Sequence, residues 1–280
     1  MAQEILDVLA DMRARKQPYA VATVVETVGS VSAKTGSKAV IDRDGQVVAG
    51  WVGGGCAEST ACEAALRCME TGDTAVIDID LDDEVLGAGM PCGGSMRVYL
   101  EPALPRPVLW IMGHGRVAEC LCQIGDLMGL EVVVNDPVVS WEKFPGAARL
   151  ITDDLDYEQL TPTDGDYVVI ATQHKGDHES MKRALASGAG YIALIASKKR
   201  SRLVLDYLRQ AGFGEQDLAK VMAPSGLELG ARSPEEIALC VISEIVLVRR
   251  GGSGRRMRDT LNEGPQQQPR AVGGHRAPGR

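Results

Sequence analysis

The first hundred residues mix helical and strand-like spacing of apolar side chains. Apolar residues from Ile5 to Met12 follow helical spacing, and another helix is predicted from about Cys56 to Met69. The dipeptide Asp44-Gly45 separates two short apolar runs and suits a tight hairpin turn. Strands are predicted at residues 19–27, 39–41, 46–52, 77–81 and 96–100. This half therefore predicts a mixed α+β domain.

The second half repeats a different pattern, a short and mostly apolar run followed by a segment of helical character. Such runs are typical of strands buried on both faces, and their alternation with helices predicts a parallel sheet. The runs lie at residues 108–112, 131–135, 149–152, 167–172 and 191–195. A proline-rich break at residues 102–107 separates the two halves. We predict an N-terminal α+β domain at 1–103 and a Rossmann-like, doubly wound domain at 107–248.

Charge is distributed unevenly along the 280 residues, whose net charge is −8. Residues 249–280 contain eight arginines and two acidic residues, so they carry +6 and leave about −14 on residues 1–248. This tail is rich in Gly, Pro and Gln, and we expect it to be disordered. An acidic body argues against nucleic acid as a partner. The arginines could contact an acidic partner, but we favour a solvated tail.

Composition points to a globular protein, with 45% hydrophobic and 24% charged residues. No apolar run approaches the roughly 20 residues that span a bilayer, so we expect no membrane insertion. The first residues lack the basic-then-apolar order of a secretory signal. We therefore expect a cytoplasmic protein, in which the seven cysteines would be reduced.

A glycine turn organises the first domain, with the sequence Gly53-Gly54-Gly55-Cys56-Ala57-Glu58. Glycines allow a ligand to approach the backbone closely, and the N-terminus of the following helix favours anions. A thiol at that position loses its proton more readily. The segment thus indicates a reactive cysteine beside an anion-binding loop. A tight turn with a small buried cysteine explains the same residues.

A second segment, Pro91-Cys92-Gly93-Gly94, again combines a cysteine with glycines. Cys56 and Cys92 are the candidate thiols of the chain. No Cys-x-x-Cys pair occurs, which disfavours a structural zinc site. The remaining five cysteines, at positions 62, 68, 120, 122 and 240, are most simply small core residues.

The second domain opens with a nucleotide-binding signature. The strand 108–112 runs into Gly113-His114-Gly115-Arg116-Val117-Ala118, which matches Gly-x-Gly-x-x-Gly/Ala before a predicted helix. Asp136, at the end of the next strand, occupies the place of the acid that binds a ribose hydroxyl. This context predicts the fold well, but the same fold binds several nucleotides and pterins, so NAD(P) stays one of several candidate cofactors.

A polar cluster follows the strand 167–172, where open α/β sheets bind ligands. It contains His174, Asp177 and His178, and the two histidines are one helical turn apart. The three side chains could hold a metal ion. We favour a polar loop that faces the ligand, with Asp177 near the start of the next helix.

Taken together, these segments resemble the XdhC/CoxI family of accessory factors for the maturation of molybdenum hydroxylases such as xanthine dehydrogenase and carbon monoxide dehydrogenase. The resemblance covers about residues 20–248. It is carried by segments 53–58, 91–94, 113–118, 174–178, 192–199, 226–231 and 233–236. It implies binding of the molybdenum–pterin cofactor, as molybdopterin or its dinucleotide form, support of its sulfuration, and delivery to an apo molybdenum hydroxylase.

The resemblance also implies partners and site residues. A cysteine desulfurase and the apo enzyme are the expected partners, and a homodimer is left open. Thiolates are soft ligands, so Cys56 or Cys92 could contact molybdenum or pass on sulfur. One departure concerns the loop after Gly29-Ser30, where many relatives carry Pro-Arg and this chain has Val31-Ser32. Lys34 or Lys38 could replace that arginine, which leaves the client enzyme open.

Three hypotheses follow. The first is a cofactor-insertion chaperone that binds without turnover, with the glycine turns and the polar loop as its site. The second is an NAD(P)-dependent oxidoreductase that uses the second domain, with His174 or His178 as acid or base. The third is a scaffold that recruits a cysteine desulfurase. The two cysteine–glycine segments favour the first.

Overall fold

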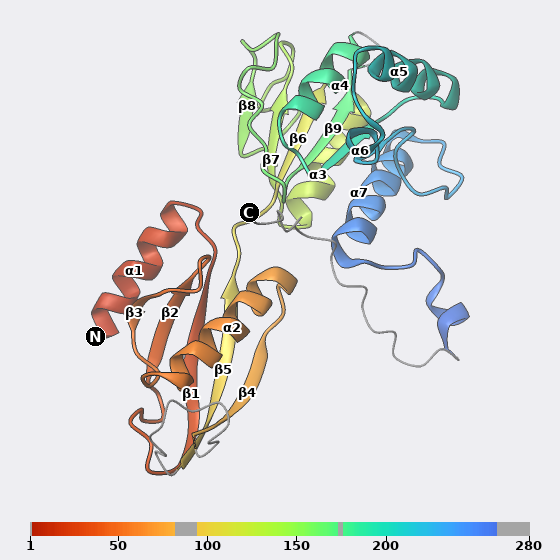
Figure 1. Cartoon of the computed structure of the whole chain (residues 1–280). Coiled ribbons are helices and arrows are strands. Elements are labelled where there is room, and N and C mark those ends of the chain that lie inside the picture. The colour runs from red at the N-terminus through yellow and green to blue at the C-terminus, as the bar shows by residue number, and fades with distance from the viewer. Residues whose placement is uncertain (1, 82–93, 173–175, 262–280) are drawn as a thin grey trace. The chain divides into compact units, whose positions relative to one another are not determined.

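The computed structural model describes residues 2–81, 94–172 and 176–261. The chain forms two compact units, Met1–Pro105 and Arg106–Arg280, which we describe separately (Figure 1). No helix among these residues has the length and apolar character needed to cross a membrane.

The first unit contains a five-stranded antiparallel sheet in the order β3-β2-β1-β5-β4. Its strands are β1 (Tyr19–Gly29), β2 (Lys38–Asp42), β3 (Val47–Gly50), β4 (Ala75–Asp80) and β5 (Gly94–Ala103). The long central strand β1 pairs with β2 on one side and with β5 on the other. The hairpin expected around Asp44-Gly45 is confirmed as the pair β2 and β3.

Two helices pack on opposite faces of this sheet. Helix α2 (Cys56–Thr71) buries a row of alanines that includes Ala57, Ala61 and Ala65. Helix α1 (Ala2–Ala14) buries Ile5 and Met12. Neighbouring residues of β2 point to the two different layers, since Ile41 belongs to the α2 core and Val40 to the α1 core. The alternating pattern of the first domain is therefore confirmed as an α+β unit.

The second unit contains a six-stranded parallel sheet in the order β11-β10-β9-β6-β7-β8. Its strands are β6 (Val108–Gly113), β7 (Glu131–Asn135), β8 (Arg149–Ile151), β9 (Tyr167–Ala171), β10 (Tyr191–Leu194) and β11 (Val221–Met222). The first strand, β6, lies in the middle, and the chain winds outward from it in both directions. This strand order is that of the Rossmann fold.

Helices cover both faces of this parallel sheet. Their bounds are α3 (Arg116–Leu127), α4 (Asp177–Ala186), α5 (Lys198–Gln210), α6 (Glu215–Leu218) and α7 (Pro234–Arg250). Helices α3 and α7 pack on one face with Leu109 and Ile111, whereas α4 and α5 pack on the other with Trp110 and Met112. Successive residues of β6 thus enter different cores, which explains its wholly apolar sequence. The predicted doubly wound fold is confirmed.

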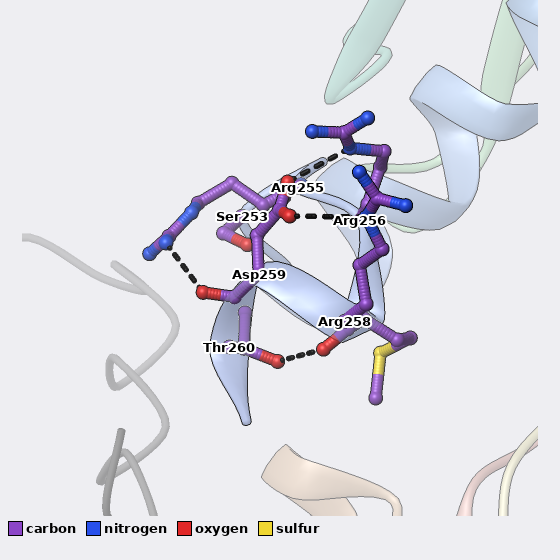
Figure 2. Close-up of polar contacts among 7 residues, drawn as sticks. Ser253, Arg255, Arg256, Arg258, Asp259 and Thr260 are labelled. Atoms are coloured by element: carbon purple, nitrogen blue, oxygen red, sulfur yellow. Dashed lines mark hydrogen bonds and ion pairs between the residues drawn. The ribbon is translucent and has the colours of Figure 1, made fainter. Parts of the chain in front are cut away.

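The last helix and the segment after it follow local capping rules. Ser233 and Glu236 form the predicted capping box at the start of α7, and Gly251 ends the helix with a φ of 63°. Part of the segment expected to be a disordered tail is folded, because Met257–Thr260 form a short 3₁₀ helix. Figure 2 shows how Asp259 holds its neighbours: Arg256 Nε donates to its carboxylate at 2.8 Å and Arg255 Nη2 to its carbonyl at 3.0 Å. Residues 262–280 lie outside the described residues.

Candidate functional site

The glycine turn of the first unit joins β3 to α2. Gly53 has a φ of +111°, and a Cβ there would lie 3.3 Å from Ala57 Cβ. Gly55 is the N-cap of α2, with a φ of 60° and no side-chain cap. A Cβ at Gly54 or Gly55 would meet nothing within 4 Å, so the backbone here is open to an approaching molecule.

Cys56 is the first residue of α2 and is half-buried, which places its thiol beside the open turn. Glu58 lies in the same first turn and is also half-buried. Burial, with a contribution from the Glu58 charge, raises the pKa of Cys62 one turn further along. The Glu58 carboxylate opposes the attraction of an anion to this end of the helix, so the turn suits a thiol contact better than a purely electrostatic one.

The second cysteine–glycine segment is described only at its end. Gly94 begins β5, and a Cβ there would lie 2.5 Å from the carbonyl oxygen of Val28. Gly94 is therefore required by the close pairing of β5 with β1, whatever else it does. Cys92 and Gly93 lie outside the described residues.

Four of the five cysteines expected in the core are buried there: Cys68, Cys120, Cys122 and Cys240. Cys62 is half-buried. Burial raises the pKa of Cys122 to about 11, so this thiol stays protonated near neutral pH. The described residues contain no group of three or more His, Cys, Asp or Glu side chains that could hold a metal ion.

The glycine turn of the second unit joins β6 to α3 as the signature predicts. Gly113 has a φ of +123°, and a Cβ there would lie 2.4 Å from the carbonyl oxygen of Ala171. Gly115 is the N-cap of α3, with a φ of 93°. The first glycine thus allows β6 and β9 to approach closely, and the second exposes the first N–H groups of the helix.

Two residues predicted to bind the cofactor contact each other at this turn. His114 Nδ1 lies 2.8 Å from Asp136 Oδ2. Strands β6 and β7 pair Met112 with Asn135, so the residues that follow them meet at the same edge of the sheet. The side chain of Asp136 is 12% exposed, and its other oxygen accepts a hydrogen bond from Val138 N at 3.0 Å.

Arg116, the first residue of α3, connects two helix starts. Its Nε donates to Glu235 Oε1 at 3.0 Å, and Nη1 donates to Glu119 Oε2 at 3.3 Å. The backbone N–H of Glu235 and this guanidinium hold the pKa of Glu235 below its usual range. The side chain of Arg116 remains 56% exposed, so it can still reach a ligand.

A pocket of about 540 Å³ opens at the carboxyl ends of β6, β9 and β10. Its walls come from the glycine turn, the strand ends and α7, and the lining residues are His114, Arg116, Val117, Ala171, Ile195, Ala196, Ser197, Ser225 and Ile237. The first turns of α3 and α5 both border it, which directs two positive helix ends toward the same space. This is the edge of the sheet where open α/β folds bind their ligands.

Ser197 and Ser225 bring hydroxyl groups to this pocket, and neither was predicted from the sequence. Ser197 caps α5 by accepting a hydrogen bond from Arg200 N. Ser225 Oγ is buried without a hydrogen-bond partner in the described residues, although Ser225 N donates to Leu194 O at 3.0 Å. An unpaired buried hydroxyl is costly, and a bound polar group or an ordered water would supply the missing hydrogen bond. For Ser197 the available signal was its position just after the apolar run that forms β10, whereas Ser225 follows a strand too short to be recognised from the sequence.

Sequence models from one family match both units. A model of the XdhC Rossmann domain matches residues 109–245, and a model of the XdhC and CoxI family matches residues 12–80. The chain belongs to the XdhC and CoxI family. The resemblance found in the sequence is therefore confirmed.

Three curated proteins are similar in sequence to this XdhC/CoxI chain. It is 28% identical to the uncharacterized protein YqeB of Escherichia coli over 88% of this chain and 46% of YqeB. It is 29% identical to a probable xanthine dehydrogenase subunit of Bacillus subtilis over 55% of this chain and 46% of that protein. It is 24% identical to the molybdenum cofactor insertion chaperone PaoD of Escherichia coli over 81% of this chain and 82% of PaoD. The chain thus spans about half the length of the first two.

In this XdhC/CoxI chain Asp177 and His178, the described residues of the polar cluster after β9, are not among the residues that line the pocket. Asp177, the first residue of α4, is 1% exposed; Thr172 Oγ1 donates to it, and so does Arg200 Nε at 3.0 Å. His178 packs edge to face on Tyr207, with ring centroids 5.0 Å apart. These contacts fix the start of α4 against α5. His174 lies outside the described residues.

Proposed function

We propose that this chain is an accessory factor that binds the molybdenum–pterin cofactor, supports its sulfuration and inserts it into an apo molybdenum hydroxylase. Membership in the XdhC and CoxI family and the relationship to PaoD, an insertion chaperone by its name, support this proposal. A cysteine desulfurase is the proposed source of sulfur, and the client is an enzyme of the xanthine dehydrogenase or carbon monoxide dehydrogenase type.

The observation that carries the proposal is the pocket at the carboxyl edge of the parallel sheet. A pterin cofactor combines a flat heterocycle with a phosphate, and the pocket combines apolar walls such as Val117 and Ile237 with two helix starts. The buried hydroxyl of Ser225 lacks a partner that a bound polar group would supply. The residues present therefore fit the phosphate end of such a ligand.

The first unit, considered by itself, contains a second candidate contact for the cofactor. The open backbone at Gly54 and Gly55 lets a flat molecule approach Cys56, which begins α2. Molybdenum bound by the cofactor accepts soft sulfur ligands, and a thiolate at Cys56 is of that kind. In this proposal Cys56 and Cys92 are the residues that contact the metal end or carry sulfur.

The test is to purify the chain from a host that makes the cofactor and to measure the bound pterin by the fluorescence of its oxidised form. We expect wild type to retain pterin, and both Cys56→Ala and Ser225→Ala to lose most of it. Cys62→Ala is the matched control, because Cys62 is a half-buried cysteine on the same helix. A wild-type protein that never carries pterin would contradict the proposal.

The second candidate is an NAD(P)-dependent oxidoreductase. The strand order of the second unit and the position of Asp136 after β7 favour it, since both are features of dinucleotide-binding sheets. Saturable binding of NADH that is lost in Asp136→Asn, together with the absence of pterin, would select this alternative.

A further inference from the structure

The contact between His114 and Asp136 affects which ligands the nucleotide-binding turn can hold. In a dinucleotide-binding sheet, the acid at the end of the second strand binds the ribose hydroxyls of the adenosine half. Asp136 holds this position after β7, but His114 Nδ1 already lies 2.8 Å from its Oδ2. The ribose acceptor is therefore occupied by a side chain of the turn itself.

The surroundings make this contact hard to replace. The second carboxylate oxygen of Asp136 accepts a hydrogen bond from Val138 N, and the side chain is only 12% exposed. Both oxygens are thus engaged by this chain. His114 stands between the two turn glycines, both of positive φ, so its backbone is held close to the end of β7.

The pocket that the described residues of the second unit form lies at the ends of β6, β9 and β10. The pocket is lined by residues that follow β6, β9, β10 and β11, and none of its lining residues lies on β7. The histidine therefore covers the carboxylate that would hold the ribose, whereas the pocket lies next to Ala171 and Ser225.

We infer that His114 determines the ligand class of the second unit: by pairing with Asp136 it closes the ribose subsite and leaves a pocket for a phosphorylated ring compound without an adenosine half. A dinucleotide that uses Asp136 would compete with His114 for the carboxylate, which weakens its affinity by about ten-fold or more.

Binding of ADP-ribose, the half of NAD that would use this subsite, tests the inference directly by calorimetry. For wild type we expect no saturable binding up to about 1 mM. His114→Ala uncovers Asp136 and should bind ADP-ribose at least about ten-fold more tightly than wild type. The double variant with His114→Ala and Asp136→Asn should lose this gain, because the uncovered acceptor is no longer a carboxylate.

Gln123→Ala is the matched control, since Gln123 is exposed on the same helix α3 and lies outside the pocket lining. It should bind ADP-ribose as weakly as wild type, and thermal unfolding should show that each variant is folded. Micromolar binding by wild type, no gain in folded His114→Ala, or a gain that persists in the double variant would each overturn the inference. This result is independent of the proposed function, because pterin content is measured in a separate experiment. A chain that carries no pterin could still show the gain in ADP-ribose affinity.

Discussion

The two units each contain a strand, a glycine turn and a helix, yet their glycines serve different purposes. In the second unit Gly113 is enclosed, and a Cβ there would lie 2.4 Å from a backbone oxygen. In the first unit Gly54 and Gly55 face open space, with nothing within 4 Å of an added Cβ. Both helices begin after an N-cap glycine of positive φ, at Gly55 and at Gly115.

This contrast separates glycines that the packing of the fold requires from glycines that leave open space beside the backbone for a ligand. Close contact between β6 and β9 explains Gly113 without any ligand. No packing explains Gly54, and the helix that follows it begins with a cysteine in place of the arginine that starts α3. The first turn is therefore the better candidate for chemistry and the second for binding and shape. Substitutions at the glycines and cysteines of the two turns can break or sharpen this contrast.

The largest effect is expected for Gly113→Ala. The added methyl group collides with the Ala171 carbonyl, and the residue would also hold a φ of +123° that only glycine adopts easily. We expect the second unit to lose about 3 kcal/mol or more of unfolding free energy. Urea unfolding can follow the buried Trp110 in a background with Trp51→Phe and Trp141→Phe, both of which replace exposed side chains.

A smaller loss is expected for Gly55→Ala. The space beside Gly55 is open, so only the backbone conformation, with φ 60° and ψ −124°, opposes a side chain. Such a conformation costs a non-glycine residue about 1–2 kcal/mol. Hydrogen–deuterium exchange of the α2 amides should accelerate accordingly, while exchange in α3 should not change. Equal losses for Gly55→Ala and Gly113→Ala would remove the distinction between the two turns.

The rates at which the cysteines react with an alkylating reagent extend this comparison of the two units. Cys56 is half-buried beside the open turn, whereas Cys122 in α3 is fully buried and its pKa is raised to about 11. At pH 8 we expect iodoacetamide to modify Cys56 at least about ten-fold faster than Cys122, as measured by mass spectrometry of the separated peptides. Cys120, whose pKa is also raised by burial, should react as slowly as Cys122.

The pH dependence of Cys122 follows from the direction of its pKa shift. Its folded-state pKa lies above the ordinary thiol value of 9.0, so the folded protein retains this proton when the unfolded chain has lost it. The stabilisation from Cys122 should therefore be complete below about pH 9 and decrease as the pH rises toward 11. A Cys122→Ala variant should lack this part of the decline in unfolding free energy. If its pH profile has the same slope as wild type, the pKa of Cys122 is not raised by folding.

Much of this architecture could be predicted from the sequence, because it depends on local periodicity. The apolar runs predicted the strands of the parallel sheet, and the Gly-x-Gly turn with its helix located β6 and α3. The two-residue strand β11 and the one-turn helix α6 were not predicted, since they are too short to show a period.

The site was less predictable, because it depends on contacts between distant side chains. His114 and Asp136 were each expected to face a ligand, and only the pairing of β6 with β7 shows that they face each other. Asp177 was expected near a helix start in a loop that faces the ligand; it does begin α4, and Arg200, 23 residues further on, pairs with it in the interior. Ser225 enters the pocket only because β11 brings its loop beside Leu194. Periodicity carries no information on such pairs.

The smallest effect on stability is expected for Gly54→Ala. Gly54 has no positive φ, and a Cβ there meets no atom within 4 Å, so the unfolding free energy should change by no more than about 0.5 kcal/mol. The methyl group nevertheless occupies the space in which a bound molecule would approach the backbone, so retained pterin should fall well below the wild-type level. Urea unfolding and pterin fluorescence on the same preparation measure the two quantities. Unchanged stability with unchanged pterin would mean that the open turn holds no part of the cofactor, and the contrast between the two turns would then describe only the packing of two helices.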